Sequence, residues 1–366
     1  MYAHNYASMS NVIFTVSEKM VDRLCSAGFV TQHRGKDKLM MKLKHLLDNR
    51  ELVLHLLEYW DYDQEKPEIL DQFRISSNAI YPFYRDGKVC LLRFAPITEK
   101  SFDSVQAEME FMAYLHSHGL SVPRPVEAKN GKTLLLCDTP WGVYTAAAFH
   151  RVLGKRMDTI DFDANLLNAY GRNLAELHLL SRAYSPKGKR RNTWQEQLDW
   201  AEGCLLSCHA PDIAIKEMST IRSALSSLSI DSDNYGLIHY DYELDNVFFN
   251  AESGLISTID FDDSHYHWYG MDMERALSNL EEELEAEQIS AAKESFLSGY
   301  SSLIELGSDT SSSYPVFKRY AGIIQYTRCL RAGHEKLDGE PDWMIGLRQH
   351  LSHIMQNNAK AFGTDL

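Results

Sequence analysis

Two short apolar runs are each followed by polar side chains that could do chemistry. Leu237-Ile238 precedes a loop with Asp241 and Asn246, and the run from Ile256 to Ile259 precedes Asp260. Hard oxygen ligands at two loop ends suit Mg²⁺, which takes few protein ligands and completes its shell with phosphate and water. A carboxylate that the metal does not use can take a proton from an attacking hydroxyl. Asp and Asn also favour turns, but their joint spacing behind apolar runs indicates a functional site.

The spacing of these residues also resembles a known family. His239-x-Asp241-x4-Asn246, followed by Ile259-Asp260-Phe261-Asp262, is similar to the catalytic and metal-binding loops of aminoglycoside phosphotransferases and choline kinases. The resemblance covers roughly residues 60 to 300 and implies the bilobal protein-kinase-like fold. It implies Asp241 as catalytic base, Asn246 and Asp260 as Mg²⁺ ligands between nucleotide phosphates, and His239 as a brace for the loop. Asp272 falls where the family has an Asp that hydrogen-bonds to the loop backbone.

The same resemblance assigns nucleotide contacts to the first half of the chain. Arg93 stands where the family has a basic residue, usually Lys, on the nucleotide phosphates, and Glu108 matches its acidic partner. Asn78 lies in the expected phosphate-covering loop, and Phe149 to Gly154 would be the hinge that holds the adenine by backbone hydrogen bonds. The sequence departs from the family in three places: Arg93 replaces Lys, Tyr240 replaces a Gly, and the phosphate-covering loop has no glycine.

Periodicity and turn residues predict the elements that position these side chains. Residues 79–85 and 88–94 flank Asp86-Gly87, a strong hairpin signal, and Pro82 suggests an edge or a bulge there. Residues 101–118 show a helical stripe that ends at Gly119. Further strands are expected over 133–138 and 143–150, and helices over 166–177 and from 273 onward. Residues 184–192 are expected to form an exposed basic loop.

These elements predict an α+β, two-lobed protein. We expect a helical N-terminal extension over residues 1–60, with apolar residues at helical spacing in 39–47 and 52–57. A nucleotide-binding lobe over 61–152 would contain a five-strand antiparallel sheet and one helix. A mainly helical lobe over 153–366 would carry the catalytic and substrate-binding site.

Composition narrows the class of protein. Of 366 residues, 37 are Lys or Arg and 51 are Asp or Glu, so the formal charge is −14, which argues against a nucleic-acid binder. Hydrophobic residues make up 44%, enough for a core. The N-terminal residues do not resemble a signal peptide. No apolar run is long enough for membrane insertion. The six cysteines are scattered along the chain, which suggests reduced thiols. A cytoplasmic protein of unknown oligomeric state is expected.

The acidic excess is concentrated near the expected catalytic loop. Residues 241–287 contain fourteen acidic residues and one basic residue, Arg275, and the rest of the chain is nearly neutral. This favours a cationic substrate. The acidic residues that could contact it are Glu243, Asp245, Asp263, Glu281 and Glu282.

The sequence therefore predicts an ATP- or GTP-dependent, Mg²⁺-requiring phosphotransferase that acts on a hydroxyl of a small, cationic molecule, such as an aminoglycoside-like antibiotic, an amino alcohol or a choline-like amine. A pseudokinase-like nucleotide-binding protein, a protein kinase and a metal-dependent hydrolase remain open. The hydrolase would hold its metal through His239, His265 or His267, although alternating imidazoles among aromatic residues more often serve packing.

Overall fold

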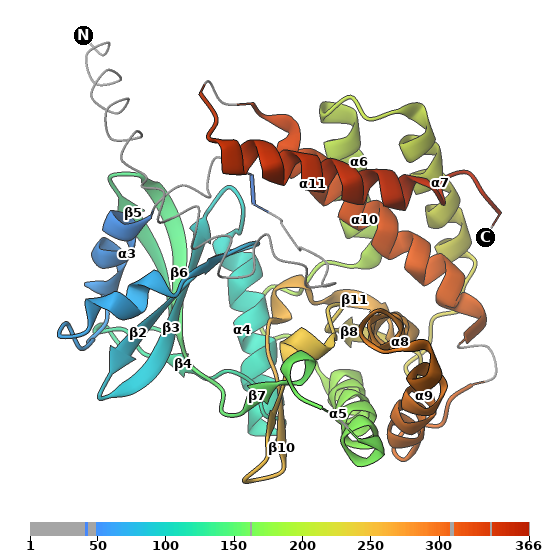
Figure 1. Cartoon of the computed structure of the whole chain (residues 1–366), viewed down its shortest axis with the longest axis horizontal. Helices are drawn as coiled ribbons and strands as arrows, with labels where there is room; N and C mark the ends of the chain where they lie inside the picture. The colour runs from blue at the N-terminus through green and yellow to red at the C-terminus, as the bar shows by residue number, and fades with distance from the viewer. Residues whose placement is uncertain (1–40, 43–48, 162, 308–310, 337–338, 366) are drawn as a thin grey trace.

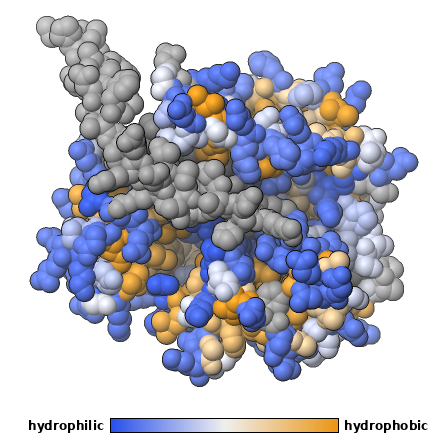
Figure 2. Space-filling model, viewed as in Figure 1, coloured by the Kyte–Doolittle hydropathy of each residue, from blue (hydrophilic) through white to orange (hydrophobic). Residues whose placement is uncertain are grey.

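The computed structural model describes residues 41–42, 49–161, 163–307, 311–336 and 339–365. Figure 1 shows a smaller lobe built on an antiparallel sheet beside a larger, mainly helical lobe. The expected bilobal α+β fold is confirmed. Hydrophilic residues predominate over the coloured part of the face seen in Figure 2, and hydrophobic ones appear in several separate places, one of them over the small lobe. Within the described ranges, every helix is too short or too polar to span a lipid bilayer.

The small lobe contains one six-stranded sheet rather than the five strands expected. The order is β1 (Arg74–Ile75), β2 (Ala79–Arg85), β3 (Lys88–Pro96), β6 (Gly142–His150) and β4 (Pro125–Val126), and β5 (Leu134–Thr139) also pairs with β6. All these pairs are antiparallel. Strands β1 and β4 lie outside the expected strand ranges, because two residues each are too few for an alternating pattern to show in the sequence.

Local chemistry explains the hairpin between β2 and β3. Asp86 and Gly87 have φ angles of 51° and 70°, as a two-residue turn with positive φ requires. The Asp63 carboxylate accepts hydrogen bonds from both backbone N–H groups, at 3.3 and 2.9 Å. Pro82 pairs with Leu91 of β3, beyond the two β2 residues that pair with β1, so it occupies an edge as expected.

One helix of the small lobe packs against both lobes. Helix α4 (Phe102–Ser117) begins at the N-cap Ser101, whose hydroxyl accepts the N–H of Ser104, and it stops before Gly119, which has a φ of 98°. Its buried Phe111 contacts Phe261 of the large lobe at a ring-centroid distance of 6.0 Å. Helix α4 is therefore in direct contact with the loop that is expected to bind the metal.

The large lobe is built mainly from helices. These are α5 (Ala164–Ala183), α6 (Trp194–Ser207), α7 (Asp212–Ser226), α8 (Tyr269–Glu283), α9 (Ala286–Ser301), α10 (Tyr314–His334) and α11 (Asp342–Ala359). Helices α5 and α9 approach closely because they meet at two glycines. A Cβ on Gly171 would lie 1.9 Å from the carbonyl oxygen of Phe296, and one on Gly299 would lie 1.8 Å from that of Asn168.

Short strands in the large lobe fix the two loops that carry the expected site. Strand β8 (Tyr235–Ile238) pairs with β11 (His265–Trp268), while β9 (Val247–Asn250) pairs with β10 (Leu255–Thr258) and β7 (Lys155–Arg156). Short 3₁₀ turns complete the lobes: η3 (Pro67–Asp71), η4 (Met157–Thr159), η5 (Leu244–Asn246), η6 (Phe261–Asp263) and η7 (Ser311–Ser313). Loops 239–246 and 259–264 are thus bounded at both ends by the same strand pairs, Ile238–His265 and Val247–Thr258.

The expected N-terminal extension lies largely outside the described residues. Its one described helix, α3 (Arg50–Leu57), buries Leu52 and Leu56 in the same hydrophobic core as the small-lobe sheet. Helix was also expected over 39–47, but Met41 and Lys42, the two described residues of that run, are not helical. The Met41 side chain is buried in the small-lobe core and its N–H donates to the Ser76 carbonyl, so tertiary contact overrides the local helical pattern.

Candidate active site

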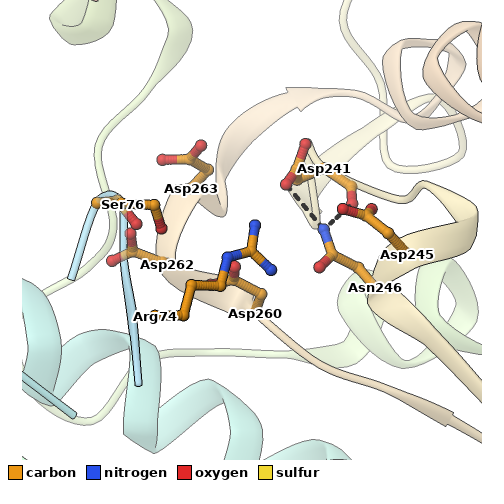
Figure 3. A pocket seen from close by; sticks show the side chains of 9 residues that line it. Arg74, Ser76, Asp241, Asp245, Asn246, Asp260, Asp262 and Asp263 are labelled. Atoms are coloured by element: carbon orange, nitrogen blue, oxygen red, sulfur yellow. Dashed lines mark hydrogen bonds between the residues drawn. The ribbon is translucent and has the colours of Figure 1, made fainter. Parts of the chain in front are cut away.

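The two loops bounded by the strand pairs meet in one pocket. The Ile259 N–H donates to the Asn246 carbonyl at 2.9 Å, so the loops are joined directly as well as through their strands. The pocket lies at the boundary of the lobes and is shown in Figure 3. Its described lining residues are Arg74, Ser76, Ser77, Asp241, Asp245, Asn246, Asp260, Asp262 and Asp263.

Asp241 and Asn246 face each other across their shared loop. The Asn246 amide donates to the Asp241 carbonyl at 2.9 Å and to the Asp241 carboxylate at 2.8 Å, drawn as dashed lines in Figure 3. These two bonds use the amide nitrogen of Asn246, which leaves its side-chain oxygen as the atom that can bind a cation. The Arg275 guanidinium lies 3.7 Å from the other carboxylate oxygen of Asp241.

His239 holds the loop from inside. Its Nδ1 accepts the N–H of Asp241 at 3.2 Å, and its Nε2 lies 2.8 Å from the Ile259 carbonyl. A nitrogen that accepts from a backbone N–H carries no proton, so the neutral ring has its proton on Nε2 and donates it to Ile259. His239 therefore connects the loop of Asp241 to the loop of Asp260.

Asp272 on α8 holds the start of the same loop. Its carboxylate accepts the backbone N–H groups of His239 at 2.8 Å and Tyr240 at 2.5 Å. His178 of α5 lies 3.1 Å from the same carboxylate and 2.8 Å from the Tyr300 hydroxyl. Burial lowers the pKa of His178 although the Asp272 bond opposes this, so the imidazole is neutral and its partners satisfy both nitrogens.

Both loops contain a non-glycine residue with left-handed backbone. Tyr240 has a φ of 70° and Asp260 a φ of 65°, conformations that are strained for side chains other than Gly, Asn or Asp. Tyr240 is held by more than Asp272, because the guanidinium groups of Arg275 and Arg328 lie 5.9 and 5.6 Å from the centroid of its ring. Strain that the surroundings maintain in this way is a common property of functional loops.

The donor set at Asp260 and Asn246 fits Mg²⁺. Burial, with the charges of Asp262 and Asp241, raises the pKa of the Asp260 carboxyl to about 7, against the opposing charges of Arg93 and Arg74. A divalent cation would relieve this crowding of negative charge and keep the carboxylate ionised. The described residues contain no group of three or more His, Cys, Asp or Glu placed to hold a metal ion. Mg²⁺ fits such a site because one or two protein ligands suffice beside phosphate and water.

Two of the histidines that a hydrolase would use, His265 and His267, are not among the described residues that line the pocket. The His265 Nδ1 lies 2.9 Å from the Asp263 carbonyl and its Nε2 lies 3.2 Å from the Tyr320 hydroxyl. His267 accepts the Trp268 N–H at 2.9 Å and packs edge-on against Phe317. Both rings are buried in the large lobe, which matches the expectation that they serve packing.

The acidic residues around the site are largely matched by basic ones from distant parts of the chain. Lys100 lies 2.7 Å from Asp262, and Arg328 binds Asp263 through two bonds of 2.9 and 3.1 Å. Burial would raise the pKa of the Asp263 carboxyl, but the charges of Arg328 and Lys100 outweigh it and hold the pKa below its usual value. Arg275 pairs with Glu243. The −13 charge of segment 241–287 is therefore compensated in part within the fold.

The five acids proposed to contact substrate divide into three groups. Asp245 and Asp263 line the pocket. Glu243 lies beside it, paired with Arg275. Glu281 and Glu282, at the end of α8, are not among the described lining residues, and Glu281 pairs with Lys293. Asp245, Asp263 and Glu243 therefore lie at the site. Glu281 and Glu282 lie apart from it.

The expected nucleotide contacts lie on the small-lobe side. Arg93 forms two parallel bonds to Glu108, of 2.7 and 2.9 Å, and stacks over the Phe149 ring at 4.9 Å. Burial lowers the pKa of Arg93, but Glu108 more than compensates and keeps it above its ordinary value. Asn78 is buried and donates to Ser77, which lines the pocket. Gly154 has a φ of 107°, and a Cβ there would lie 2.4 Å from the Phe249 carbonyl oxygen.

Sequence reasoning missed several basic residues at the site: Arg74, Lys100, Arg191, Arg275 and Arg328. Arg191 was expected in an exposed loop, but it is buried and its guanidinium donates to the carbonyls of Ser264, Asp262 and Ser104, at 2.7, 2.5 and 2.9 Å. Only Arg275 had a sequence signal, since it lies three residues after Asp272 on the same helix face. The others reach the site from distant positions.

Comparison with known proteins shows the family of the chain. The model of the phosphotransferase enzyme family (APH) matches residues 75–306, which include every loop described above. The chain belongs to this family. A curated relative, the amicoumacin kinase of Bacillus subtilis (strain 168), is 29% identical over 219 residues, which cover 57% of this chain and 63% of that protein. The match to this phosphotransferase relative thus spans less than two thirds of its length.

Solved structures of other phosphotransferases share the fold. An amicoumacin kinase in complex with AMP-PNP, Ca²⁺ and Ami superposes with a TM-score of 0.70 at 22% identity, covering 88% of this chain and 97% of that one. A microcompartment-associated aminopropanol kinase gives a TM-score of 0.59 at 19% identity, covering 85% and 97%. A spectinomycin phosphotransferase in complex with ADP and spectinomycin gives 0.50 at 14% identity, covering 84% and 98%. At these identities the likeness is one of fold.

Proposed function

We propose that this protein transfers the γ-phosphoryl group of ATP or GTP to a hydroxyl of a small molecule, with Mg²⁺ bound by Asn246 and Asp260. The observation that carries the proposal is that Asp241, Asn246 and Asp260 line one pocket at the lobe boundary of a phosphotransferase-family chain. Bound Mg²⁺ would neutralise charge on the nucleotide phosphates.

The residues of the chain would act mainly by positioning. The Asn246 bond orients the Asp241 carboxylate, which takes the proton of the acceptor hydroxyl as its oxygen attacks the γ-phosphorus. Asp272 and His239 keep the strained loop in place. Arg93, fixed by Glu108, would contact the nucleotide phosphates through guanidinium N–H groups that Glu108 does not use. The segment from Phe149 to Gly154 joins the lobes and would hold the nucleotide base.

The acceptor is proposed to carry an amine. Asp245 and Asp263 offer carboxylates to the pocket, with Glu243 beside them. Related proteins are named as kinases of amicoumacin and of aminopropanol, and the second name contains both an amine and an alcohol. Because Arg275 and Arg328 already offset two of these acids, we expect recognition of a single ammonium group rather than of a polycation.

A substrate panel tests this proposal. Purified protein is incubated with ATP or GTP and Mg²⁺ against amino alcohols, choline-like amines, aminoglycosides and other hydroxylated antibiotics, each beside an analogue that lacks the amine. Mass spectrometry should find one acceptor that gains a single phosphoryl group, and EDTA should abolish the gain. Binding of nucleotide with no transfer to any acceptor would favour a pseudokinase-like role. Phosphate release from compounds without nucleotide would favour a hydrolase.

A further inference from the structure

Arg74 is the only basic residue among the described residues that line the pocket. It lies on β1, where it pairs with Ile80, directly before the loop Ser76-Ser77-Asn78. In Figure 3 its side chain extends into the pocket, and its guanidinium points toward the space between Asp260 and Asn246. That space lies between the proposed metal ligands and Asp241.

The other basic residues around the pocket are each engaged: Arg191 binds backbone carbonyls, and the rest bind carboxylates. These pairs are Arg93 with Glu108, Lys100 with Asp262, Arg275 with Glu243, and Arg328 with Asp263. Arg74 makes no ion pair within the part of the chain that the structure describes, and its side chain is exposed. Among those residues, its guanidinium has no ion pair to break before it contacts an incoming phosphate.

The loop after Arg74 is poorly equipped to bind phosphate through its backbone. Phosphate-binding loops use glycines because the backbone must approach the ligand closely and offer its N–H groups. Here no glycine occurs between Arg74 and Ala79, and the Ser76 N–H is already bonded to the Asn78 carbonyl at 3.0 Å. Side chains add donors here, because Ser76 and Ser77 both line the pocket with Arg74.

We propose that Arg74 is a catalytic residue that binds the γ-phosphoryl group during its transfer, an inference that rests on the proposed function. In that step the acceptor oxygen bonds to the γ-phosphorus and its proton passes to Asp241. The bond from phosphorus to the bridging oxygen breaks, and its electron pair leaves on the nucleoside diphosphate. Negative charge spreads over the equatorial oxygens, which a guanidinium fork matches in charge and geometry.

Kinetic constants of Arg74→Ala test the inference. Loss of one preorganised donor to a transition state costs about 10²–10³-fold in kcat, so we expect a loss of that size with a change of less than about fivefold in nucleotide KM. Arg74→Lys should recover only part of kcat, and added guanidinium ion should partly restore Arg74→Ala. Arg85→Ala is the matched control, because this arginine ends β2 of the same sheet and binds the Glu127 carbonyl.

A second measurement does not need the acceptor. Thermal shift is recorded with ADP and Mg²⁺, with and without aluminium fluoride, which mimics the phosphoryl group in transfer. The extra shift from aluminium fluoride should be present in the wild type and in Arg85→Ala and absent in Arg74→Ala. Unchanged kcat in Arg74→Ala, or a loss confined to nucleotide KM, would overturn this inference alone. A wild type that neither transfers phosphate nor binds nucleotide would overturn the proposed function and the inference with it.

Discussion

The carboxylate of Asp272 accepts the backbone N–H of Tyr240 at 2.5 Å, and Tyr240 has a φ of 70°. The strained residue that follows His239 is thus held by a buried carboxylate from a different element, α8. The same carboxylate binds the N–H of His239 and the imidazole of His178. One side chain therefore fixes the start of the loop that carries Asp241.

Replacing Asp272 should damage both stability and turnover. In Asp272→Asn one carboxylate oxygen becomes an NH₂ group, which cannot accept from the backbone of His239 or Tyr240. Leaving a buried donor without a partner costs about 1–3 kcal/mol, so we expect the free energy of unfolding in urea to fall by about that amount. kcat should fall with it, because the loop loses its fixed path. Asp233→Asn, at an exposed aspartate paired with Arg182, is the control and should change neither quantity.

Glu108→Gln should weaken nucleotide binding. The change removes the charge that holds the buried Arg93 fork in place, and breaking a buried pair costs roughly 3–5 kcal/mol. We expect a loss of stability of that order and a nucleotide Kd raised at least about tenfold, since a mobile guanidinium no longer offers preorganised donors. Isothermal calorimetry and urea unfolding measure the two effects.

The control for that variant is Glu176→Gln, which breaks an exposed pair with Arg172 one turn away on α5. It should change stability by less than about 1 kcal/mol. If Glu108→Gln bound nucleotide as tightly as the wild type, Arg93 would have no part in the nucleotide site.

Arg191 and its neighbour Arg190 should behave in opposite ways. Arg191 ties the carbonyls of Asp262 and Ser264 to Ser104 at the start of α4, whereas Arg190 forms an exposed pair with Glu196. Arg191→Ala should loosen the loop of Asp260 and raise the Mg²⁺ concentration needed for half-maximal activity several-fold. Arg190→Ala should leave that concentration unchanged. An equal response of the two variants would show that Arg191 does not position the metal loop.

Stability should fall between pH 6.5 and pH 5 partly because of His265. Burial lowers the pKa of His265 to about 4, whereas the unfolded chain protonates it near the usual value of 6.5. Between these values only the unfolded state takes up the proton, so stability decreases as the pH falls and this contribution levels off below about pH 4. The loss from this residue is on the order of 2 kcal/mol at pH 5.

Urea unfolding at pH 7 and pH 5 measures this dependence. The His265→Gln variant should lose less stability between the two values than the wild type, while His353→Gln, at an exposed position on α11, should lose as much. Equal losses in all three proteins would mean that His265 is protonated in the folded state.

The sequence predicted those features whose signals are local. Asp241, Asn246 and Asp260 stood out because each follows an apolar strand at a fixed spacing, and local signals also predicted the Asp86-Gly87 turn and the end of a helix before Gly119. The two-residue strands β1 and β4 were missed, because a pair of residues shows no periodicity.

Ion pairs between residues far apart in the chain were not predicted from the sequence. Lys100 reaches Asp262 across 162 positions and Arg328 reaches Asp263 across 65, and no local pattern marks such partners. The acidic segment consequently looked more negative than it is in the folded protein. The sequence placed Arg191 in an exposed basic loop. In the structure it is buried, and its hydrogen bonds to backbone carbonyls connect the two lobes.

Single-turnover transfer by Asp241→Asn tests the central claim most directly. The substitution keeps an oxygen that can accept the Asn246 amide, so the pocket should keep its shape while losing its base. With wild type and variant both saturated with nucleotide, Mg²⁺ and the acceptor found in the panel, the variant should transfer phosphate at least about 10²-fold more slowly. Its nucleotide Kd and melting temperature should match those of the wild type and of the exposed-site control Asp212→Asn. Transfer by Asp241→Asn at the wild-type rate would contradict the assignment of Asp241 as the catalytic base.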